Sequence, residues 1–392
     1  MGCNLWFLHT SYGVGVGGCR CRHCFSLRAS ISIRISSNMG NSFDLLRLAA
    51  ALAVFFAHGD FLYRLHLPVP FPGHSLGSLA VSVFFFISGY LVCQSWIRKP
   101  TWRVFWVKRL TRVFPGLVVA VAFSVFVLGW AVTTLPSAAY WQASSTWLNF
   151  VNNAVGLATV QTLPGVFESN PFARAVNGSL WTIRYELAMY GVLSALSWGM
   201  RGRRWVYPAT ALVLACLWQL ARMGAWDAAL EATGGPMAEL FRWSDFCGFG
   251  VPFFAGSTFA VYAVRPRQWM AVVALLAVVG GLYAESALLR QMAVWVLMVC
   301  GTFYLAHVRY SSVASAASAG HGRVDLSYGV YIYAFPVQQA VTALCLARGW
   351  SFAVCLLVSL VPIVLLAWLS WFGVEQPCMR AAQRWLHRIN SK

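Results

Sequence analysis

The chain has 392 residues, of which 59% are hydrophobic and only 10% are charged. An average soluble domain carries roughly 25% charged residues, so this composition excludes an ordinary soluble protein. The net charge of +18 would suit a nucleic-acid-binding protein. The basic residues stand, however, in short clusters between apolar segments, which is typical of topology signals in membrane proteins and argues against nucleic acid as a partner.

Residues 1–38 differ from the rest of the chain, with four cysteines, four arginines and no acidic residue. The GCRCRHC run suggests a metal knuckle, but a structural zinc site usually needs a second pair of ligands. The segment also lacks the apolar core of a signal peptide. We therefore predict a disordered or non-native extension over 1–38, a native start at Met39 and no metal site.

Ten continuous apolar segments follow, each about 20 residues long, which is the length of a helix that crosses a bilayer. They do not alternate between apolar and polar residues as barrel strands do. We predict an all-α fold, a polytopic transmembrane helical bundle with about ten spans. The predicted spans are 44–63, 76–97, 113–133, 178–199, 206–223, 243–264, 267–284, 288–307, 325–346 and 351–373.

Two further features lie along these segments. The long connection at 134–177 contains Trp141 and Trp147, and we expect its amphipathic part to lie at the membrane interface. The cysteines beyond residue 38, such as Cys93 and Cys216, mostly lie in apolar runs and are predicted to act as small hydrophobic residues.

Lys and Arg are distributed unequally between the two sides of the predicted bundle. An excess of these residues marks the cytoplasmic side. The connections after the even-numbered spans and the C-terminal tail hold 17, whereas the opposite side holds 7 near the span ends. Both termini are therefore predicted to be cytoplasmic, as an even number of spans requires, and residues 379–392 form a basic cytoplasmic tail. The first set is Arg98, Lys99, Arg103, Lys108, Arg109, Arg112, Arg201, Arg203, Arg204, Arg265, Arg267, Arg309, Arg323, Arg380, Arg384, Arg388 and Lys392, and the second is Arg64, Arg174, Arg184, Arg222, Arg242, Arg290 and Arg348.

The first span carries the ionisable residues Asp44, Arg47 and His58. A charged residue at a helix centre costs at least ~2.5 kcal/mol on insertion, so each is a candidate for function. Asp44 and Arg47 are three residues apart and can pair. Arg47 and His58 are eleven apart, about three turns, which places both on one face of the helix, roughly 16 Å apart along its axis. The alternative for these residues is a contact that packs helices.

The fourth span begins NGSLWTIRYELAMY, with Glu186 and Tyr190 one turn apart on one face. A buried carboxylate needs a partner, and we expect Glu186 to pair with a protonated His58 or with Arg184. His58 and Glu186 would then form a general base and its orienting acid. A salt bridge between helices without chemistry is the alternative.

The second span contains small residues, and a cluster of basic residues follows it. Ser88 and Gly89 are small enough to let helix backbones approach closely. Arg109 and Arg112, with Lys108 beside them, form a cluster that suits lipid head groups or a phosphorylated ligand, or that serves topology alone.

The last two spans carry aromatic and acidic residues near their ends. Tyr and Trp at such positions usually anchor a span at the interface, although Tyr328 near the cytoplasmic entrance could contact a donor substrate. Asp325 and Arg323 are expected to cap the ninth span. For Glu375 we expect a structural role at the cytoplasmic surface.

Six blocks in this order resemble the acyltransferase-3 family of membrane acyltransferases. The blocks are FDLLRLAAALAVFFAH (43–58), GSLAVSVFFFISGYLV (77–92), KRLTRVFP (108–115), NGSLWTIRYELAMY (177–190), LSYGVYIYAFPV (326–337) and VEQP (374–377). The resemblance covers residues 41 to 380 and implies an acyltransferase-3-like domain over 39–378. Family members transfer an acyl group, commonly acetyl, from coenzyme A on the cytoplasmic side to a hydroxyl of a sugar or glycan such as an O-antigen or exopolysaccharide.

The resemblance also implies roles for individual residues. Arg47 and His58 match the Arg and His of the family motif, and Glu186 falls at its acidic position. We expect Arg109, Arg112 and Arg47 to bind the phosphates of acyl-CoA. His58 then acts as a general base or a transient acyl carrier, and Glu186 orients it. Candidates for substrate or oxyanion contacts are Asn177 and Tyr190, and candidates for support of the site are Asp44, Ser88, Trp181 and Tyr328.

The chain differs from other members of the family in two respects. Family members often have a histidine where this chain has Ala334, which puts a mechanism with a second histidine in doubt. The C-terminal hydrolase-like domain of some relatives is not expected here.

A transporter of a lipid-linked sugar would share the buried charges, but it predicts a repeat between the halves. The last five spans carry no trio like Arg47, His58 and Glu186. A membrane scaffold or sensor is the other rival. Basic cytoplasmic loops and the family favour a bacterial inner membrane, whereas the acceptor, the acyl chain length and the oligomeric state are left open.

Overall fold

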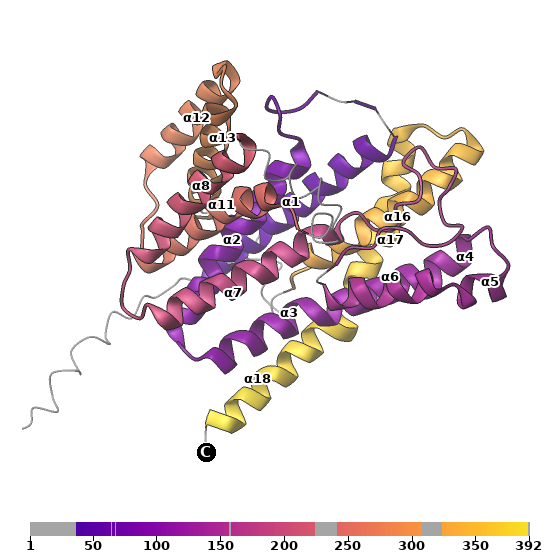
Figure 1. The fold of residues 1–392 in the computed structure, drawn as a ribbon, viewed down its shortest axis with the longest axis horizontal. Helices are drawn as coiled ribbons and strands as arrows, with labels where there is room; N and C mark the ends of the chain where they lie inside the picture. Colours follow the sequence, from indigo (N-terminus) through magenta and orange to yellow (C-terminus); the bar gives the residue numbers. More distant parts are fainter. Residues whose placement is uncertain are drawn as a thin grey trace, which may run out of the picture. The chain divides into compact units, whose positions relative to one another are not determined.

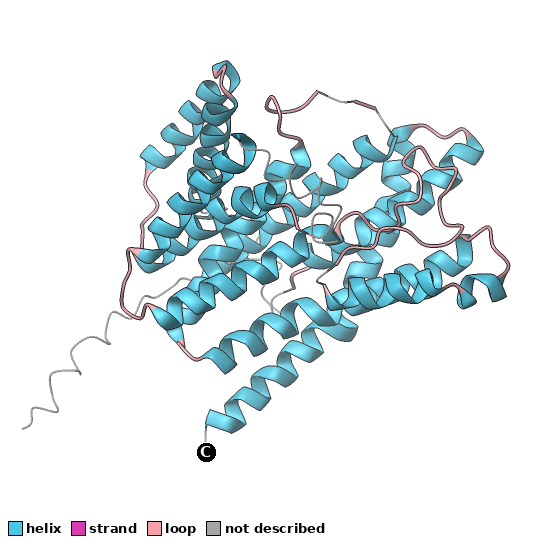
Figure 2. Ribbon diagram, viewed as in Figure 1, coloured by secondary structure: helices cyan, strands magenta, loops and turns pink. Residues whose placement is uncertain are grey.

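The computed structural model describes residues 37–63, 65–66, 68–156, 158–223, 241–307 and 324–390. The predicted extension lies outside these residues, except that its last two belong to the first helix. Arg64, Arg309, Arg323 and Lys392 also lie outside them. Residues 38–392 form one compact unit. The described residues fold into helices joined by loops, with two isolated β-bridges and no extended strand (Figure 2), which confirms the all-α prediction.

The helices follow one another in a fixed order (Figure 1). The longer elements are α1 (Ser37–Tyr63), α2 (Leu76–Arg98), α3 (Trp102–Ala122), α6 (Ser144–Val155), α7 (Ile183–Gly199), α8 (Val206–Met223), α11 (Trp243–Val261), α12 (Gln268–Tyr283), α13 (Ala287–Val296), α16 (Ser327–Arg348), α17 (Phe352–Ser370) and α18 (Gln376–Asn390). The short ones are η1 (Phe123–Gly129), α4 (Trp130–Val132), α5 (Ser137–Gln142), η2 (Leu180–Thr182), η3 (Leu297–Gly301), α14 (Thr302–His307) and η4 (Trp371–Glu375).

Each of the ten predicted spans is helical over most of its length. Within the described residues, seven continuous helical stretches are long and apolar enough to cross a membrane. They are Ser42–Tyr63, Leu76–Arg98, Trp102–Val132, Val206–Met223, Ala287–His307, Ser327–Arg348 and Phe352–Ile389. The other three predicted spans correspond to α7, α11 and α12, which are shorter or less apolar. The prediction of a polytopic helical membrane protein is confirmed, and the number of spans and the side of each terminus stay predictions.

Glycine residues bring α2 and α11 together at the centre of the bundle. A Cβ on Gly89 would stand 1.9 Å from the Phe253 carbonyl oxygen, and one on Gly256 would stand 2.3 Å from the Phe86 carbonyl oxygen. Only the absence of side chains at both positions lets the two backbones touch in this way. The predicted role of Gly89 in close helix packing is therefore confirmed.

Two prolines inside helices leave a backbone carbonyl without its usual donor four residues on. Pro336 lies in α16 and frees the Ile332 carbonyl, which accepts a hydrogen bond from Asn177 Nδ2 at 2.9 Å. In α11, Pro252 leaves the Gly248 carbonyl without a donor in the same way. This carbonyl accepts a hydrogen bond from Trp295 Nε1 of α13 at 3.0 Å. Each of these two hydrogen bonds ties a proline-containing helix to a neighbouring element.

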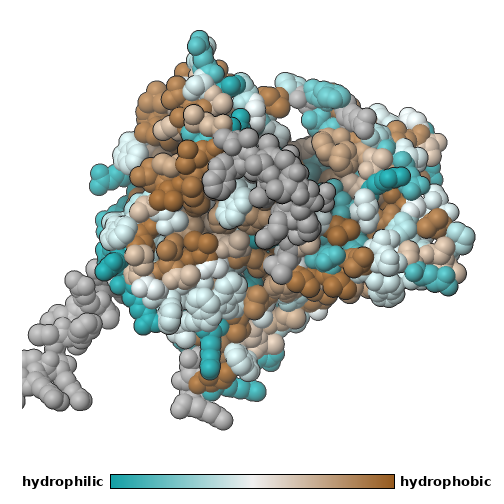
Figure 3. Space-filling model, viewed as in Figure 1, coloured by the Kyte–Doolittle hydropathy of each residue, from teal (hydrophilic) through white to brown (hydrophobic). Residues whose placement is uncertain are grey.

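The connection between η1 and α7 folds into the short helices α5 and α6, and Trp141 and Trp147 from them pack against Phe126. One face of α6 is exposed and apolar, as in Trp147 and Val151. Apolar surface also covers α12 and α13, in brown at the upper left of Figure 3. Large exposed apolar faces of this kind suit contact with lipid.

The chain after α17 continues as a helix rather than as an irregular tail. The η4 turn leads directly into α18, drawn in yellow in Figure 1, which packs along α3. The predicted boundary between residues 378 and 379 falls inside α18, whose Leu386 is buried.

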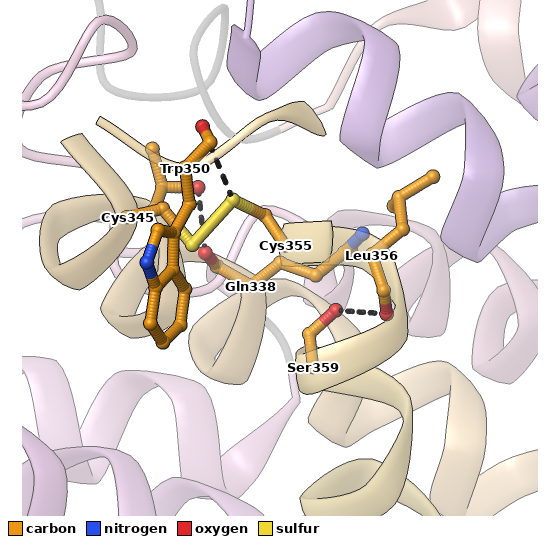
Figure 4. Close-up of a disulfide and its surroundings, with 7 residues drawn as sticks. Gln338, Cys345, Trp350, Cys355, Leu356 and Ser359 are labelled. Atoms are coloured by element: carbon orange, nitrogen blue, oxygen red, sulfur yellow. Dashed lines mark hydrogen bonds between the residues drawn. A yellow bond between two sulfur atoms is a disulfide. The ribbon is translucent and has the colours of Figure 1, made fainter. Parts of the chain in front are cut away.

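A disulfide joins Cys345 at the end of α16 to Cys355 at the start of α17, across a turn of a few residues (Figure 4). The prediction that the cysteines beyond residue 38 act as small hydrophobic residues is wrong for this pair. Among the described residues, Cys93, Cys247 and Cys300 are buried, lie outside the disulfide and fit that prediction.

Candidate active site

A narrow cavity of about 110 Å³, here called the arginine cavity, lies among α1, α2, α3, α7 and α16. Its polar lining consists of Arg47, Ser88, Arg109, Arg112, Thr182, Glu186, Tyr190, Tyr328 and Tyr331. Apolar side chains of α2, such as Phe84 and Leu91, line the rest. All three arginines that the sequence assigns to the donor thus line one cavity.

Two of these arginines are held by buried carboxylates. Asp325 Oδ2 accepts from Arg47 Nη1 at 2.5 Å and from Arg112 Nη2 at 2.6 Å. Arg112 Nη1 also donates to Glu375 Oε2 at 2.9 Å, and Ser370 donates to the other oxygen of that carboxylate. The network therefore links α1, α3, the start of α16 and η4. It leaves further N–H groups of both guanidinium groups for a ligand, because each group has five.

Asp325 precedes the apolar stretch that begins at Ser327. Burial raises the pKa of its carboxyl, but Arg47 and Arg112 lower it, with the hydroxyl and amide of Ser327, to about 2. The carboxylate is therefore ionised at neutral pH. Sequence analysis expected Asp325 to act as a helix cap, and its bond to the Ser327 amide at 3.1 Å fits that role. Its second role, between two arginines, was missed.

Arg109 is different, because it forms no ion pair with a described residue and its Nε is buried without a hydrogen-bond partner. Its guanidinium carbon lies 5.9 Å from the centre of the Tyr190 ring. A partly buried cation without a carboxylate is costly, so this position suits an anionic ligand that would complete it.

Glu186 enters the same cavity from α7. One of its carboxylate oxygens accepts from Ser88 Oγ at 3.1 Å and from the hydroxyl of Tyr190. Ser88 and Tyr190 also contact each other at 3.0 Å. Arg184, the alternative partner that the sequence suggested, instead lies over the Tyr185 ring at 5.2 Å. Glu186 is thus held by α2 and by its own helix.

A second and wider cavity of about 920 Å³, the histidine cavity, is lined by His58 at the other end of the predicted first span. Trp181, Phe249, Phe61 and Phe172 supply aromatic walls, and Asp60, His66, Ser78 and Asp245 supply polar groups. The His58 ring packs edge-on against Phe335, with ring centres 5.0 Å apart. Its Nδ1 is buried and has no hydrogen-bond partner among the described residues.

The two cavities are neighbours, because Val81 and Tyr331 line both. The Tyr331 hydroxyl donates to the Ser179 carbonyl at 2.9 Å and contacts Thr182 Oγ1 at 2.6 Å. The tyrosine is therefore fixed between the cavities and is not an interfacial anchor, which corrects the general expectation for tyrosines of the ninth span. Tyr328 is likewise turned inward, with its hydroxyl bonded to the Val113 carbonyl.

The structure separates some residues that the sequence placed together. His58 and Glu186 line different cavities, and the predicted contact between them is absent from their hydrogen bonds. Asn177 lies in neither cavity lining, and its side chain is bonded to Ile332 and to the Ser179 amide. Arg47 is paired with Asp325, so the proposed pairing with Asp44 stays a prediction.

The described residues contain no group of three His, Cys, Asp or Glu side chains able to hold an ion. The GCRCRHC run lies outside them. Other residues that sequence reasoning missed are Phe335, which packs against His58, and Gln338, which donates to the Phe55 carbonyl; both belong to an otherwise apolar block.

Comparison with known proteins was made on the whole chain. The model of the acyltransferase domain of the acyltransferase-3 family matches residues 41–369. An O-acetyl transferase of Shigella phage Sf6 is 31% identical over 347 residues, which cover 86% of this chain and 95% of the relative. Nodulation protein 10 of Rhizobium leguminosarum bv. viciae is 31% identical over 388 residues, covering 88% and 95%. Acyltransferase MdmB of Streptomyces mycarofaciens is 35% identical over 109 residues, covering 24% and 26%. No solved structure matches the chain.

Proposed function

Because this chain belongs to the acyltransferase-3 family, we propose that it is a membrane-embedded O-acyltransferase that moves an acetyl group from cytoplasmic acyl-CoA to a hydroxyl of a sugar or surface glycan. One observation carries the proposal: a cavity with three arginines and a cavity with an imidazole are neighbours that share the lining residues Val81 and Tyr331. In our scheme the donor and the acceptor meet at these two residues, so neither has to cross the whole bundle. Acetyl is supported by the relative named O-acetyl transferase.

The arginine cavity suits the acyl-CoA donor. Phosphate groups are bound well by arginine, whose planar group offers paired donors, and Arg109 lacks a carboxylate partner among the described residues. The cavity is narrow and partly apolar, which fits a thin pantetheine arm better than a sugar. In our scheme the phosphates bind Arg109 with Arg47 and Arg112, and the arm points toward Tyr331.

The histidine cavity suits a carbohydrate acceptor. Its volume of about 920 Å³ is in the range of pockets that enclose organic ligands, ~300–1,000 Å³. The aromatic rings of Trp181 and Phe249 offer flat apolar surfaces for the C–H faces of a sugar ring. Carboxylates such as Asp60 and Asp245 offer acceptors for its hydroxyl groups.

His58 is the base in this scheme. The proton affinity of a free imidazole suits transfer near neutral pH. The imidazole takes the proton from the acceptor hydroxyl while that oxygen attacks the thioester carbonyl carbon. The carbon–sulfur bond then breaks, the coenzyme A thiolate leaves, and it receives the proton from the imidazolium. The products are the acetyl ester and free coenzyme A.

Orientation and location follow from the same scheme. The arginine cavity is lined from the first halves of α3 and α16 and from the start of α7, and the histidine cavity from the starts of α2, α11 and α17. The excess of Lys and Arg supports a cytoplasmic position for the starts of α3 and α16. We therefore propose a bacterial inner membrane, with the donor entering from inside and the acceptor from outside.

The test uses membranes of cells that make the full chain, supplied with radiolabelled acetyl-CoA. We expect label on surface glycan in wild-type membranes and at least a ~100-fold loss in His58→Ala, the upper range for general acid–base catalysis being larger still. His387→Ala is the control, since this imidazole is exposed on α18. Equal transfer by wild type and a folded His58→Ala protein would remove His58 from the chemistry, and no label in any membrane would contradict the proposed donor or acceptor.

A further inference from the structure

One buried glutamine of α16 has an unused hydrogen-bond acceptor. The Gln338 side chain is only 3% exposed. Its Nε2 donates to the Phe55 carbonyl oxygen of α1 at 3.0 Å. Its Oε1 is buried and has no partner among the described residues. A buried amide oxygen without a donor carries a penalty of about 1–3 kcal/mol, so its retention calls for a reason.

On the facing helix α1, His58 has a ring nitrogen that could donate the missing hydrogen bond. Its Nδ1 is also buried without a partner. Phe55 and His58 are three residues apart on α1, and Phe335 and Gln338 are three apart on α16, so each pair lies on one helix face. These faces touch twice, through the His58 and Phe335 rings and through the bond from Gln338 to Phe55. A helical carbonyl points toward the following turn, which brings the Gln338 amide to the level of the His58 ring.

We propose that Gln338 is a positioning residue for His58, and that in the working enzyme these two unpartnered atoms join, with Gln338 Oε1 accepting a hydrogen bond from Nδ1–H of the imidazole. This inference rests on the proposed function. The bond a histidine makes through one ring nitrogen decides which nitrogen carries the proton. With Nδ1 protonated, Nε2 is the free base that takes the acceptor proton, and the amide oxygen stabilises the imidazolium that forms. The proton then passes to the thiolate as described above.

The residues that could otherwise orient His58 do not lie beside it. Glu186, which the sequence assigned to it, lies in the arginine cavity. The position where relatives often carry a second histidine is Ala334, which is fully buried one turn before Gln338 and packs with Ala51 and Phe55. The charged or titratable groups that share the cavity with His58 are Asp60, His66, Asp245 and Tyr331.

A purely structural role for Gln338 is the competing explanation, since its Nε2 ties α16 to α1. Two substitutions separate the roles. Gln338→Glu keeps an acceptor for Nδ1–H but loses the donor to Phe55. Gln338→Met keeps the shape and loses both groups. A structural tie predicts that the two variants behave alike, whereas positioning predicts that they differ.

The experiment measures kcat, donor KM and the pH dependence of acetyl transfer for the full chain in membranes. We expect Gln338→Met to lower kcat about 10- to 100-fold with little change in donor KM, the usual loss when an orienting partner is removed. Gln338→Glu should retain more activity, and the acidic limb of its pH profile should move to higher pH, because a carboxylate favours the imidazolium. Asp60, His66 and Asp245 are unchanged in every variant, so they cannot cause the difference.

Gln291→Glu is the matched control, because it places a carboxylate at another buried glutamine, on α13. Its acidic limb should stay at the wild-type pH. An unmoved limb in Gln338→Glu overturns the inference, even if Gln338→Met fails to fold. The proposed function would survive that result, since it depends on the loss of activity in His58→Ala.

Discussion

Arg109 differs from the other two arginines of its cavity, since no described carboxylate pairs with it. We predict that Arg109→Ala raises the donor KM by about 10- to 100-fold, which corresponds to the loss of a hydrogen bond to a charged group, and leaves stability nearly unchanged. Arg109→Lys should recover part of the effect, because it keeps the charge but not the planar donors. Steady-state kinetics with varied acetyl-CoA gives the answer.

Arg103→Ala is the control for this prediction, because Arg103 is an exposed arginine on the first turn of the same helix. It should leave the donor KM unchanged. If both variants raised the KM equally, general attraction by the basic surface would explain the effect, and Arg109 would have no special place in the donor site.

Asp325 offers a stability test at the same scale. A single carboxylate oxygen serves Arg47 and Arg112, so Asp325→Asn leaves two partly buried cations short of charge. Removing one partner of a buried ion pair typically costs about 3–5 kcal/mol. We predict a clearly lower melting temperature in detergent together with a higher donor KM. Glu168→Gln, which changes an exposed carboxylate, should melt like the wild type, and an equal melting temperature for Asp325→Asn would show that the network adds little.

The residues themselves were predicted unevenly from the sequence. Charges in apolar segments are expensive, and that physical fact identified Arg47, His58 and Glu186, each of which lines a cavity. The sequence did not identify their partners, because Asp325 is 278 residues from Arg47 and Gln338 is 283 from Phe55. Local spacing suggested nearer partners, such as Asp44 for Arg47, and only the packing of distant helices supplies the others.

At the scale of helices, the close approach of α2 and α11 makes a sharp prediction. Gly89→Ala places a methyl group 1.9 Å from the Phe253 carbonyl oxygen, and backbone atoms cannot move aside as a flexible side chain can. We expect a loss of at least about 1–3 kcal/mol from overpacking, seen as a lower melting temperature and a smaller folded fraction after extraction.

Gly191 provides the matched control within α7. A Cβ there meets nothing within 4 Å, and alanine is favoured over glycine inside a helix by roughly 0.5–1 kcal/mol. Gly191→Ala should therefore be neutral or stabilising. Equal destabilisation by both substitutions would mean that the cost comes from the loss of glycine itself and not from contact between helices.

Helices were easier to predict than their ends and irregularities. Each apolar segment of about 20 residues became a helix, since lipid leaves the backbone no other way to satisfy its hydrogen bonds. The wide turns of η1, η3 and η4 were missed, because a π-helical turn has no clear signature in composition. The helix α18 was missed as well, since its apolar residues are few and gain their partners only from α3.

A proline inside a helix explains why Asn177 does not line either cavity. Its residue type suggested a contact with substrate, but Pro336 leaves a carbonyl of α16 that this amide satisfies. The proline was visible in the sequence, and the free carbonyl four residues before it follows from geometry. The side chain that donates to this carbonyl could not be predicted from the sequence, because it comes from a loop 155 residues away.

For the whole molecule, the disulfide between Cys345 and Cys355 bears on topology. Disulfides persist outside the reducing cytoplasm, and the turn between α16 and α17 lies on the outer side in the predicted orientation. Both cysteines are buried. We therefore predict that, once a reductant that stays outside has been added to intact cells, a variant with only these two cysteines reacts with a maleimide when it is afterwards unfolded in detergent. Without the reductant it should not react.

Cys378 on α18 completes the argument from the opposite side of the membrane. It is a free thiol of intermediate exposure, and the predicted orientation places it in the cytoplasm with the arginine-rich helix ends. A variant with Cys378 alone should be labelled only after the cells are permeabilised. If Cys378 reacted on intact cells while the disulfide pair did not, the bundle would be inverted, the arginine cavity would face outward, and acyl-CoA from the cytoplasm could no longer be the donor that it binds.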